Sequence, residues 1–212
     1  MKKIMFNDRY GLTQAVIELR KPMTRRVCKE FRTGEIIYAK DVESVAMYSD
    51  ENLVEFTMKD GSIKVSVPKY KVGEVVAVAQ SYKSIHEAMM SGDFGDSKYD
   101  AFRCAAVAGT KGWTNKMYVR ADLMPYRIKI TDMKIERLQE ISEEDCLKEG
   151  VVYDSRHWVN GYKVENLWNK IDRQSHFRSA QVAFANLINR ISGKGTWLSN
   201  PYDFAYSFKL IK

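Results

Sequence analysis

The sequence predicts a single α+β domain over residues 1–212, built on a mostly antiparallel, barrel-like sheet. Short runs of alternating apolar and polar residues, typical of half-buried strands, occur along the chain. Helical spacing of apolar residues occurs in only a few places, and no internal repeat or linker rich in Pro, Gly or Ser divides the chain. These observations favour one sheet-based domain with flanking helices.

The composition excludes several classes of protein. Hydrophobic residues make up 45% and charged residues 29% of the 212, which is typical of a folded globular chain. Apolar runs stay far below the roughly 20 residues of a membrane helix, and no apolar stretch follows the basic start as in a secretory signal. We therefore expect a soluble cytoplasmic protein that has no membrane partner.

The first predicted element is a short helix that begins near Asp8 or Gly11. Its apolar stripe has the spacing of one helical face and consists of Leu12, Ala15, Val16 and Leu19. Pro22 ends this helix, and an extended segment, residues 23–28, follows it. In that segment Thr24 and Arg26 point to the same side, because they are two residues apart.

Two insertions are predicted in the middle of the chain. Residues 35–68 contain short β-rich runs and the turn signal Asp60-Gly61, which predicts a β-hairpin insertion. A buried strand is expected near residues 75–79. Residues 83–115 contain several glycine-rich turn signals and predict a loop-rich insertion with at most one short helix.

The second half predicts two helices between two strands. Residues 126–138 alternate as a long strand with an irregularity at Thr131-Asp132. Ser142 is the expected N-cap of a helix over residues 143–149 that Gly150 stops. A longer helix spans residues 179–192, and a strand over residues 202–210 closes the chain with one aromatic face.

The charge distribution points to an anionic ligand. The net charge is +7, and residues 1–34 contribute +6 of it through nine basic and three acidic residues. Such a concentration favours a polyanion or a phosphate-bearing ligand, and a solvated basic face fits it equally well. Three cysteines and three histidines lack the spacing of a disulfide framework or metal site, so we expect reduced cysteines and neither metal nor cofactor.

Four segments, in this order, resemble the ASCH domain of the PUA-like superfamily, of the type encoded by bacteria and phages. They are Glu18 to Arg26 (ELRKPMTRR), Tyr70 to Val76 (YKVGEVV), Ile130 to Gly150 with its ISEEDCLKEG end, and Trp197 to Tyr202 (WLSNPY). The resemblance implies a PUA-like small β-barrel with flanking helices, and a cleft for RNA or modified nucleotides. The two insertions are not part of it.

Some small ASCH proteins are amidohydrolases that remove the acetyl group from acetylcytidine with a Lys, a Thr and a Glu. By motif position these catalytic residues are similar to Lys21, Thr24 and Glu149. Pro22 and Arg25 depart from the pattern of those enzymes, which have a small polar and an apolar residue there, and this chain is about twice as long. These departures bear on the substrate more than on the fold.

The chemistry of these residue types agrees with that reading. Amide hydrolysis needs a nucleophile or positioned water, a base, and a donor to the oxyanion. Thr24 offers a hydroxyl, Lys21 an amine whose pKa nearby cations and burial would lower, and Glu149 a partner for that amine. The ligand or phosphate contacts are expected from Arg20, Arg25, Arg26, Trp197 and Asn200. The same residues also fit an ordinary strand, surface cations and a solvated helix end.

Three functions follow from the sequence. The first is binding of RNA or a modified nucleotide by an ASCH/PUA-like cleft. The alternative is an amidohydrolase that removes an acyl group from an acetylcytidine-like nucleoside. The second alternative is a phage-derived interaction protein without catalysis.

Overall fold

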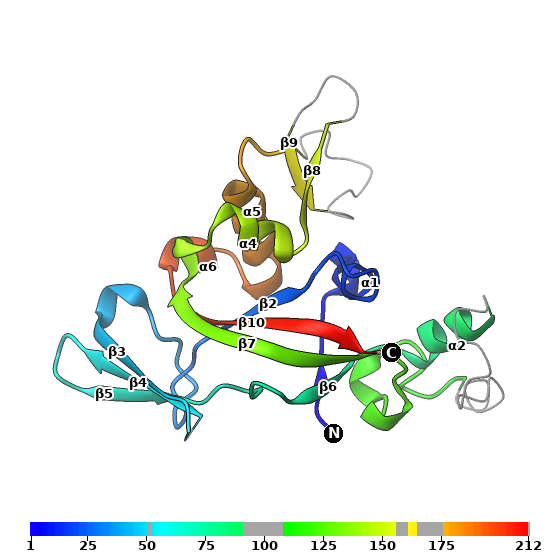
Figure 1. Ribbon diagram of the computed structural model, residues 1–212, viewed down its shortest axis with the longest axis horizontal. Helices are drawn as coiled ribbons and strands as arrows, with labels where there is room; N and C mark the ends of the chain where they lie inside the picture. The colour runs from blue at the N-terminus through cyan, green and yellow to red at the C-terminus, as the bar shows by residue number, and fades with distance from the viewer. Residues whose placement is uncertain (51, 91–107, 156–160, 165–175, 212) are drawn as a thin grey trace.

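The computed structural model describes residues 1–50, 52–90, 108–155, 161–164 and 176–211. It is a mixed α+β protein with several sheets, mainly β (Figure 1). The largest sheet has the strand order β1-β6-β7-β10-β2, and every neighbouring pair is antiparallel except β1 and β6. Its strands are β1 (Lys3–Ile4), β6 (Val75–Val78), β7 (Arg127–Arg137), β10 (Tyr202–Ile211) and β2 (Met23–Val27). The α+β class and the mostly antiparallel sheet are confirmed.

The long ladder between β7 and β10 contains the predicted irregularity. Ser207 pairs with Asp132, whereas Phe208 pairs with Ile130, so Thr131 is an extra residue in β7. An extra residue of this kind bends and twists the strand locally. The bulge therefore curves the centre of the sheet at the position that the sequence indicated.

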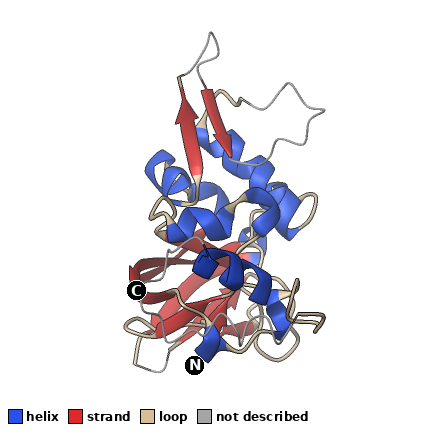
Figure 2. Ribbon diagram, turned by 90° about the vertical axis from the view of Figure 1, so that its right-hand side faces the viewer, coloured by secondary structure: helices blue, strands red, loops and turns tan. Residues whose placement is uncertain are grey.

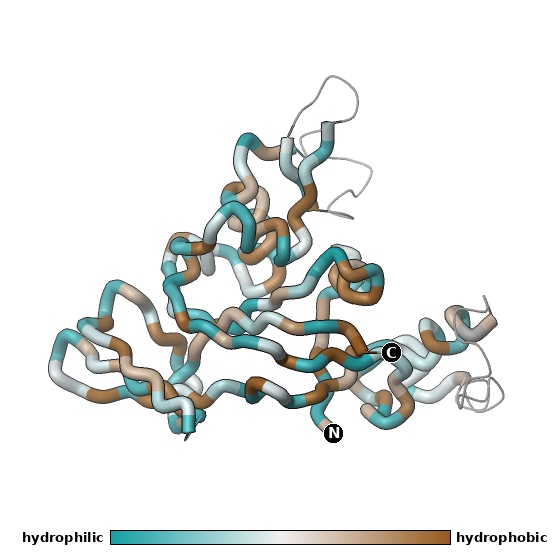
Figure 3. Tube along the Cα trace, viewed as in Figure 1, coloured by the Kyte–Doolittle hydropathy of each residue, from teal (hydrophilic) through white to brown (hydrophobic). Residues whose placement is uncertain are grey.

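Both faces of β10 are buried over its first five residues, although the alternation predicted only one apolar face. The aromatic face is buried as expected, and Figure 3 shows hydrophobic and hydrophilic residues alternating along this part of the sheet. On the other face, Asp203 is 0% exposed and Ala205 is also buried. Helix α4 (Glu143–Lys148) packs against β2, and α5 (Ala180–Ser192) packs against α4, so helices cover this second face (Figure 2).

The first helix ends earlier than predicted. A 3-10 turn, η1 (Asp8–Tyr10), precedes α1 (Leu12–Ile17), and Leu19 lies beyond the helix with φ at +64° and 69% exposure. The prediction that Leu19 belongs to the apolar stripe is therefore wrong. The amides of Arg20 and Lys21 both donate to the carbonyl of Ala15, at 2.8 and 3.0 Å. This tight turn ends the helix before Pro22 and directs Lys21 inward.

The first insertion is a three-stranded antiparallel sheet. It comprises β3 (Val42–Tyr48), β4 (Leu53–Met58) and β5 (Ile63–Ser66), in that order. The Asp60-Gly61 turn between β4 and β5 is confirmed, with Gly61 at φ +82°. The Phe56 ring lies 5.2 Å from the Tyr202 ring of β10, so this sheet shares the main core. The first β-rich run, residues 36–39, contains only isolated bridges before the 3-10 turn η2 (Ala39–Asp41).

A short helix, α2 (Tyr82–Met90), lies at the start of the second insertion, for which at most one short helix was predicted. Residues 91–107 lie outside the described residues. After the insertion come two 3-10 turns, η3 (Lys116–Tyr118) and η4 (Ala121–Leu123). Figure 1 shows α2 and the three-stranded sheet at opposite ends of the main sheet.

The remaining elements follow β7. The 3-10 turn η5 (Leu138–Glu140) leads to α4, and a two-stranded sheet of β8 (Val151–Asp154) and β9 (Gly161–Val164) lies beyond the helices. The short helix α6 (Thr196–Ser199) precedes β10. Among the described segments, no helix has both the length and the apolar character needed to cross a membrane.

The helix caps agree with the sequence. The Ser142 hydroxyl accepts a hydrogen bond from the Asp145 amide at 3.1 Å, and Ser179 caps α5 in the same way. Gly150 has φ at +101°, a conformation that favours glycine, so the chain turns directly after Glu149. The predicted bounds of these two helices are confirmed to within one residue.

Candidate functional site

Lys21 and Glu149 form a buried ion pair between the end of the first helical segment and the end of α4. The Lys21 ammonium donates to the carboxylate Oε2 and, at 2.8 Å, to the backbone carbonyl of Glu149. Lys21 is 2% exposed and Glu149 is 4% exposed. Two of the three predicted catalytic residues, 128 positions apart in the sequence, are therefore in direct contact.

Gly150 lies beside the stem of this lysine. A side chain there would have its Cβ 3.7 Å from Lys21 Cδ and 3.4 Å from a methyl group of Leu12, which are ordinary van der Waals contacts. Gly150 is left-handed, however, so another residue would strain the backbone. The glycine that ends α4 is thus required by the turn and leaves enough space beside Lys21.

Arg25 lies beside this pair and faces carboxylates. Its Nη1 donates to Asp203 Oδ1 at 3.0 Å, its Nη2 contacts Glu136, and its Nε lies 3.8 Å from Glu149 Oε1. Its Nη2 also lies 3.5 Å from Asp145 Oδ2. Arg25, which the sequence predicts to contact a phosphate, is thus surrounded by carboxylates of this chain.

The strand register explains how these groups meet. Arg25 on β2 is opposite Ala205 on β10, which is opposite Lys134 on β7. Residues opposite one another lie on the same face of a sheet, and the small Ala205 leaves room between the two cations. Asp203 is opposite Glu136 in the next row on that face. The strands thus supply four charged side chains beneath α4.

Helix α4 supplies the other side of the cluster. Lys134 lies 2.5 Å from Asp145 Oδ2 and 2.9 Å from Glu136 Oε2. The amide of Asp145 takes part in the cap of α4, while its carboxylate contacts cations of the sheet. We call the seven groups together the ion cluster: Lys21, Arg25, Lys134, Glu136, Asp145, Glu149 and Asp203.

Burial shifts the pKa of groups in the ion cluster. Loss of hydration lowers the pKa of Lys21 and outweighs the opposing effect of Glu149, while Arg26 and Arg25 add to the lowering. Burial raises the pKa of Asp203 to about 7, against the attraction of Arg25 and with the help of Glu136 and Glu149. With Asp203 protonated, three cations face three carboxylates, so the protonated form balances the charge.

Thr24 and Arg26 lie on the other face of β2. Thr24 is opposite Tyr206 and Arg26 is opposite Phe204, both on the aromatic face of β10, which confirms that the two residues share a side. Thr24 is buried, and within the described part of the chain no hydrogen bond joins its hydroxyl to Lys21 or Glu149. The structure therefore brings Lys21, Glu149 and Arg25 together and places Thr24 on the opposite side of the strand.

Arg26 connects the two edge strands. Its Nη2 donates to the carbonyl of Met5, directly after β1, at 2.8 Å, and its guanidinium lies 5.9 Å from the Phe6 ring. Arg20 pairs with Glu18 at the surface, with its Nε 2.8 Å from the carboxylate. Arg20 and Arg26, which were also predicted to contact a phosphate, therefore have partners within the chain.

Trp197 and Asn200 tie α6 to its surroundings. The Trp197 ring packs edge-on against Phe184 of α5 at 6.2 Å. Asn200 is left-handed, with φ at +44°, and its side-chain oxygen accepts from the amide of Gln139 at 2.9 Å. The carbonyl of Trp197 accepts from the Gln139 side chain at 2.7 Å. These contacts join the loop before β10 to the end of β7.

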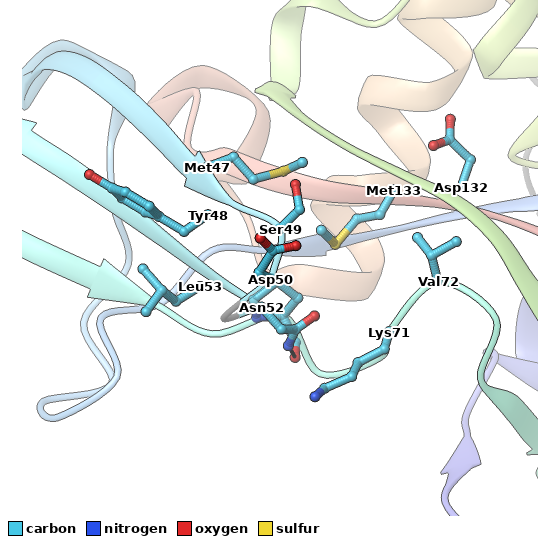
Figure 4. Close-up of a pocket in the computed structure, with 11 residues that line it drawn as sticks. Met47, Tyr48, Ser49, Asp50, Asn52, Leu53, Lys71, Val72, Asp132 and Met133 are labelled. Atoms are coloured by element: carbon cyan, nitrogen blue, oxygen red, sulfur yellow. Dashed lines mark hydrogen bonds between the residues drawn. The ribbon is translucent and has the colours of Figure 1, made fainter.

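The described residues line at least two hollows on the surface. The first, of about 310 Å³, lies between the β3–β4 turn and the bulge of β7, and its lining mixes Met47, Met133 and Val72 with Lys71 and Asp132 (Figure 4). The second is an open groove of about 920 Å³ between the three-stranded sheet and α6. Three of its lining residues are cationic and none is acidic. We call it the basic groove: Tyr38, Ala39, Lys40, Val42, Lys59, Arg137, Gln139, Leu198, Ser199 and Asn200.

Metal ligands do not gather within the described residues. No group of three or more His, Cys, Asp or Glu side chains there has an arrangement that could hold a metal ion. Cys28 and Cys146 are buried free thiols, and burial raises the pKa of Cys146 to about 12. Cys104 lies outside the described residues.

Sequence reasoning missed most carboxylates of the ion cluster. Asp203 was assigned to the polar face of a strand, and Glu136 follows the apolar positions of β7 without a motif of its own. An acidic residue between the aromatics Tyr202 and Phe204 is the one signal that could have singled out Asp203. Comparisons of this chain with protein-family models, curated proteins and solved structures found no match.

Proposed function

We propose that this protein binds RNA or a modified nucleotide through an ASCH/PUA-like cleft beside Lys21, Glu149 and Arg25. The observation that carries the proposal is the buried contact between Lys21 and Glu149. A solvated helix end and a surface cation would not meet in this way. Buried ionisable groups with a shifted pKa, such as Lys21, are concentrated at functional sites.

The proposal includes a PUA-like barrel for the main sheet. In the strand order β1-β6-β7-β10-β2 the two edges are β1 and β2. The guanidinium of Arg26 on β2 donates to the carbonyl that follows β1, and this bridge supports an arrangement in which the sheet curves until its edges approach. The bulge at Thr131 supports the same curvature.

A second candidate function is hydrolysis of an acyl amide on a cytidine-like nucleoside. The lowered pKa of Lys21 favours it, because a neutral amine can accept a proton. In this reaction water adds to the acyl carbon and Lys21 takes its proton. The C–N bond then breaks, the proton passes to the leaving nitrogen, and cytidine and acetate are the products. Glu149 would orient the amine, and Thr24 would position the water. If the Thr24 hydroxyl attacked instead of water, the acetyl group would become an ester on Thr24 when the C–N bond broke, and water would then hydrolyse that ester to acetate and restore the hydroxyl.

Calorimetric titration with acetylcytidine and with cytidine tests the binding function. We expect binding by the parent protein, loss of binding in Lys21→Met and Glu149→Gln, and unchanged binding in Glu144→Gln. Glu144 is the matched control because it lies on the same helix but is exposed and pairs only with Lys148 among the described residues. Thermal melts establish that each variant is folded. A folded Glu149→Gln that binds like the parent would contradict the proposal.

Release of cytidine from acetylcytidine tests the catalytic candidate. Lys21→Ala, Thr24→Ala and Glu149→Ala are each expected to lose most of the rate, and Thr24→Ser to keep much of it if the hydroxyl takes part. Because the base must be neutral, the rate should rise with pH until Lys21 is deprotonated. Nucleoside binding without release of cytidine in the parent would leave the binding function alone.

A further inference from the structure

We propose that the basic groove is a second binding surface, which holds the phosphate backbone of a single-stranded RNA segment. The groove lies where α6, the end of β7 and the first insertion meet (Figure 1). None of the ion-cluster residues lines it. It is therefore a separate site from the cleft of the proposed function. Part of its lining comes from the first insertion, which the ASCH resemblance does not cover.

The charges of the groove are available to a ligand. Lys40 and Lys59 are exposed, and neither has a carboxylate within 4 Å in the part of the chain that the structure describes. Arg137 pairs with Glu140 at 3.3 Å, but both side chains are about half exposed. An ion pair of this kind contributes little, so a phosphate can replace the carboxylate. The lining thus contains three cations and no acidic residue, which suits a polyanion.

Backbone contacts between distant segments hold the walls of the groove. The Lys59 amide donates to the carbonyl of Asp41 at 2.9 Å, which fixes one lysine-bearing segment against the other. The Ala39 amide donates to the carbonyl of Asn200 at 3.1 Å, which joins the insertion to the loop after α6. The groove is thus formed before a ligand arrives, and binding need not order these segments.

The groove also offers surfaces to the bases. Tyr38 lines it, and the Lys40 ammonium lies 5.9 Å from the centre of that ring. Leu198 on α6 is 84% exposed at its rim. Aromatic and apolar side chains beside a cationic track are the features by which proteins bind single strands without reading the sequence. We therefore expect weak sequence preference and strong salt dependence.

The size of the groove leaves room for a segment of a strand. Its volume of about 920 Å³ is at the upper end of the roughly 300–1,000 Å³ of small-molecule pockets, and the groove is open to solvent. The hollow of Figure 4 has a third of that volume and carries aspartates of its own. Charge and size together therefore favour the groove as the surface for a phosphodiester chain. The choice of RNA over DNA rests on the proposed function.

Fluorescence anisotropy with a labelled single-stranded 12-nucleotide RNA tests this surface, measured at several salt concentrations. The double variant Lys40→Gln/Lys59→Gln should bind about tenfold more weakly at low salt, and the salt slope should decrease by about 0.7 for each lost phosphate contact. Lys83→Gln/Lys194→Gln is the matched control, because it removes the same charge from exposed lysines that do not line the groove.

The outcomes separate this proposal from the proposed function. Equal losses in the test and control variants would overturn it, because net charge would then explain the binding. Absence of RNA binding by the parent, or tighter binding of single-stranded DNA or duplex RNA of the same sequence, would overturn it as well. The cleft is tested with nucleosides, which carry no phosphate, so binding of acetylcytidine by Lys40→Gln/Lys59→Gln should equal that of the parent even if the groove binds nothing.

Discussion

The ion cluster and the basic groove both gather charged side chains, but the two regions leave those charges in opposite states. In the ion cluster, Lys21 and Arg25 are buried and face carboxylates of the same chain. In the basic groove, Lys40 and Lys59 are exposed. Two of the nine basic residues of segment 1–34 are thus neutralised inside the protein, while the cations of the groove come from later segments.

This difference teaches that a count of charges along the sequence does not locate a polyanion surface. A buried charge loses hydration, so the fold must provide a partner for it, whereas an exposed charge stays hydrated and needs none. Arg20, Arg25 and Arg26 each have a partner within the chain. The charges of the ion cluster should therefore matter to stability, and those of the groove to binding.

The largest expected effect is that of removing the guanidinium from the ion cluster. Arg25→Met leaves the buried Asp203 without its cation and removes one of the two cations beside the partly buried Glu136, and breaking a buried pair in this way costs about 3–5 kcal/mol. Urea unfolding at pH 7 measures the loss. Arg32→Met, an exposed residue of the same basic segment, should change the free energy of unfolding by less than about 0.5 kcal/mol. Equal effects of the two changes would contradict the comparison.

The free energy of unfolding should depend on pH through the titration of Asp203. Its pKa is about 7 in the folded protein and near 3.9 in an unfolded chain, so between these values the folded state holds a proton that the unfolded state has lost. Its contribution to stability is complete below the lower value and is lost as the pH rises through the upper one. From pH 5 to pH 8 we expect a loss of about 2.5 kcal/mol.

Asp203→Asn tests this assignment, because the amide does not titrate. Urea unfolding at four pH values should show a flatter profile for this variant than for the parent. Asp132→Asn serves as the control, since Asp132 is exposed, and its profile should follow that of the parent. A parent profile that keeps its slope in Asp203→Asn would assign the dependence to another group.

A smaller effect is expected from the cap of α4. Ser142→Ala removes the hydrogen bond to the Asp145 amide and should cost about 1 kcal/mol of unfolding free energy, whereas Ser142→Gly should cost only a few tenths. Because α4 carries Asp145 and Glu149, Ser142→Ala should also weaken nucleoside binding at the cleft. Thermal melts and calorimetry measure the two effects. A larger loss with glycine than with alanine would rule out the capping explanation.

The smallest effect is expected in the groove. Lys40→Gln/Lys59→Gln should change the free energy of unfolding by no more than about 0.5 kcal/mol, because neither ammonium has a carboxylate partner among the described residues. Urea unfolding measures it alongside Arg25→Met. A loss above about 1 kcal/mol would mean that these lysines stabilise the fold, and the distinction between the two regions would fail.

Local signals in the sequence predicted local structure correctly. Ser142 and Gly150 bound α4, Asp60-Gly61 forms a hairpin turn, and β7 is irregular at Thr131. Each feature depends on residues within a few positions of it, so short-range hydrogen bonds and backbone preferences suffice to predict it. The pairing of Lys21 with Glu149 was also expected, but only from the resemblance of two distant motifs.

The burial of Asp203 and the exposure of Leu19 could not be predicted in this way. Alternation along a strand shows which residues share a face, but not whether a helix covers that face. The early end of α1 depends on the Ala15 carbonyl, which accepts two amides beyond the apolar stripe. The alternation along β10 was predicted correctly, and a helix from outside the strand buries Asp203. The apolar stripe was wrong at Leu19, because a local turn at Ala15 ends the helix before that residue.

The sequence by itself determined the α+β class and many element boundaries. Through the resemblance of two motifs it also indicated that Lys21 and Glu149 are close together. Only the tertiary structure decided which charges are buried and which are exposed, because that depends on how α4 covers β2 and how the first insertion meets α6. Helix ends and turns depend on residues that are close in the sequence. The hydration of a side chain depends instead on the elements that pack against it in the folded protein. Arg25 and Lys40 carry the same charge in the sequence, and their surroundings place one in an ion cluster and the other at the surface.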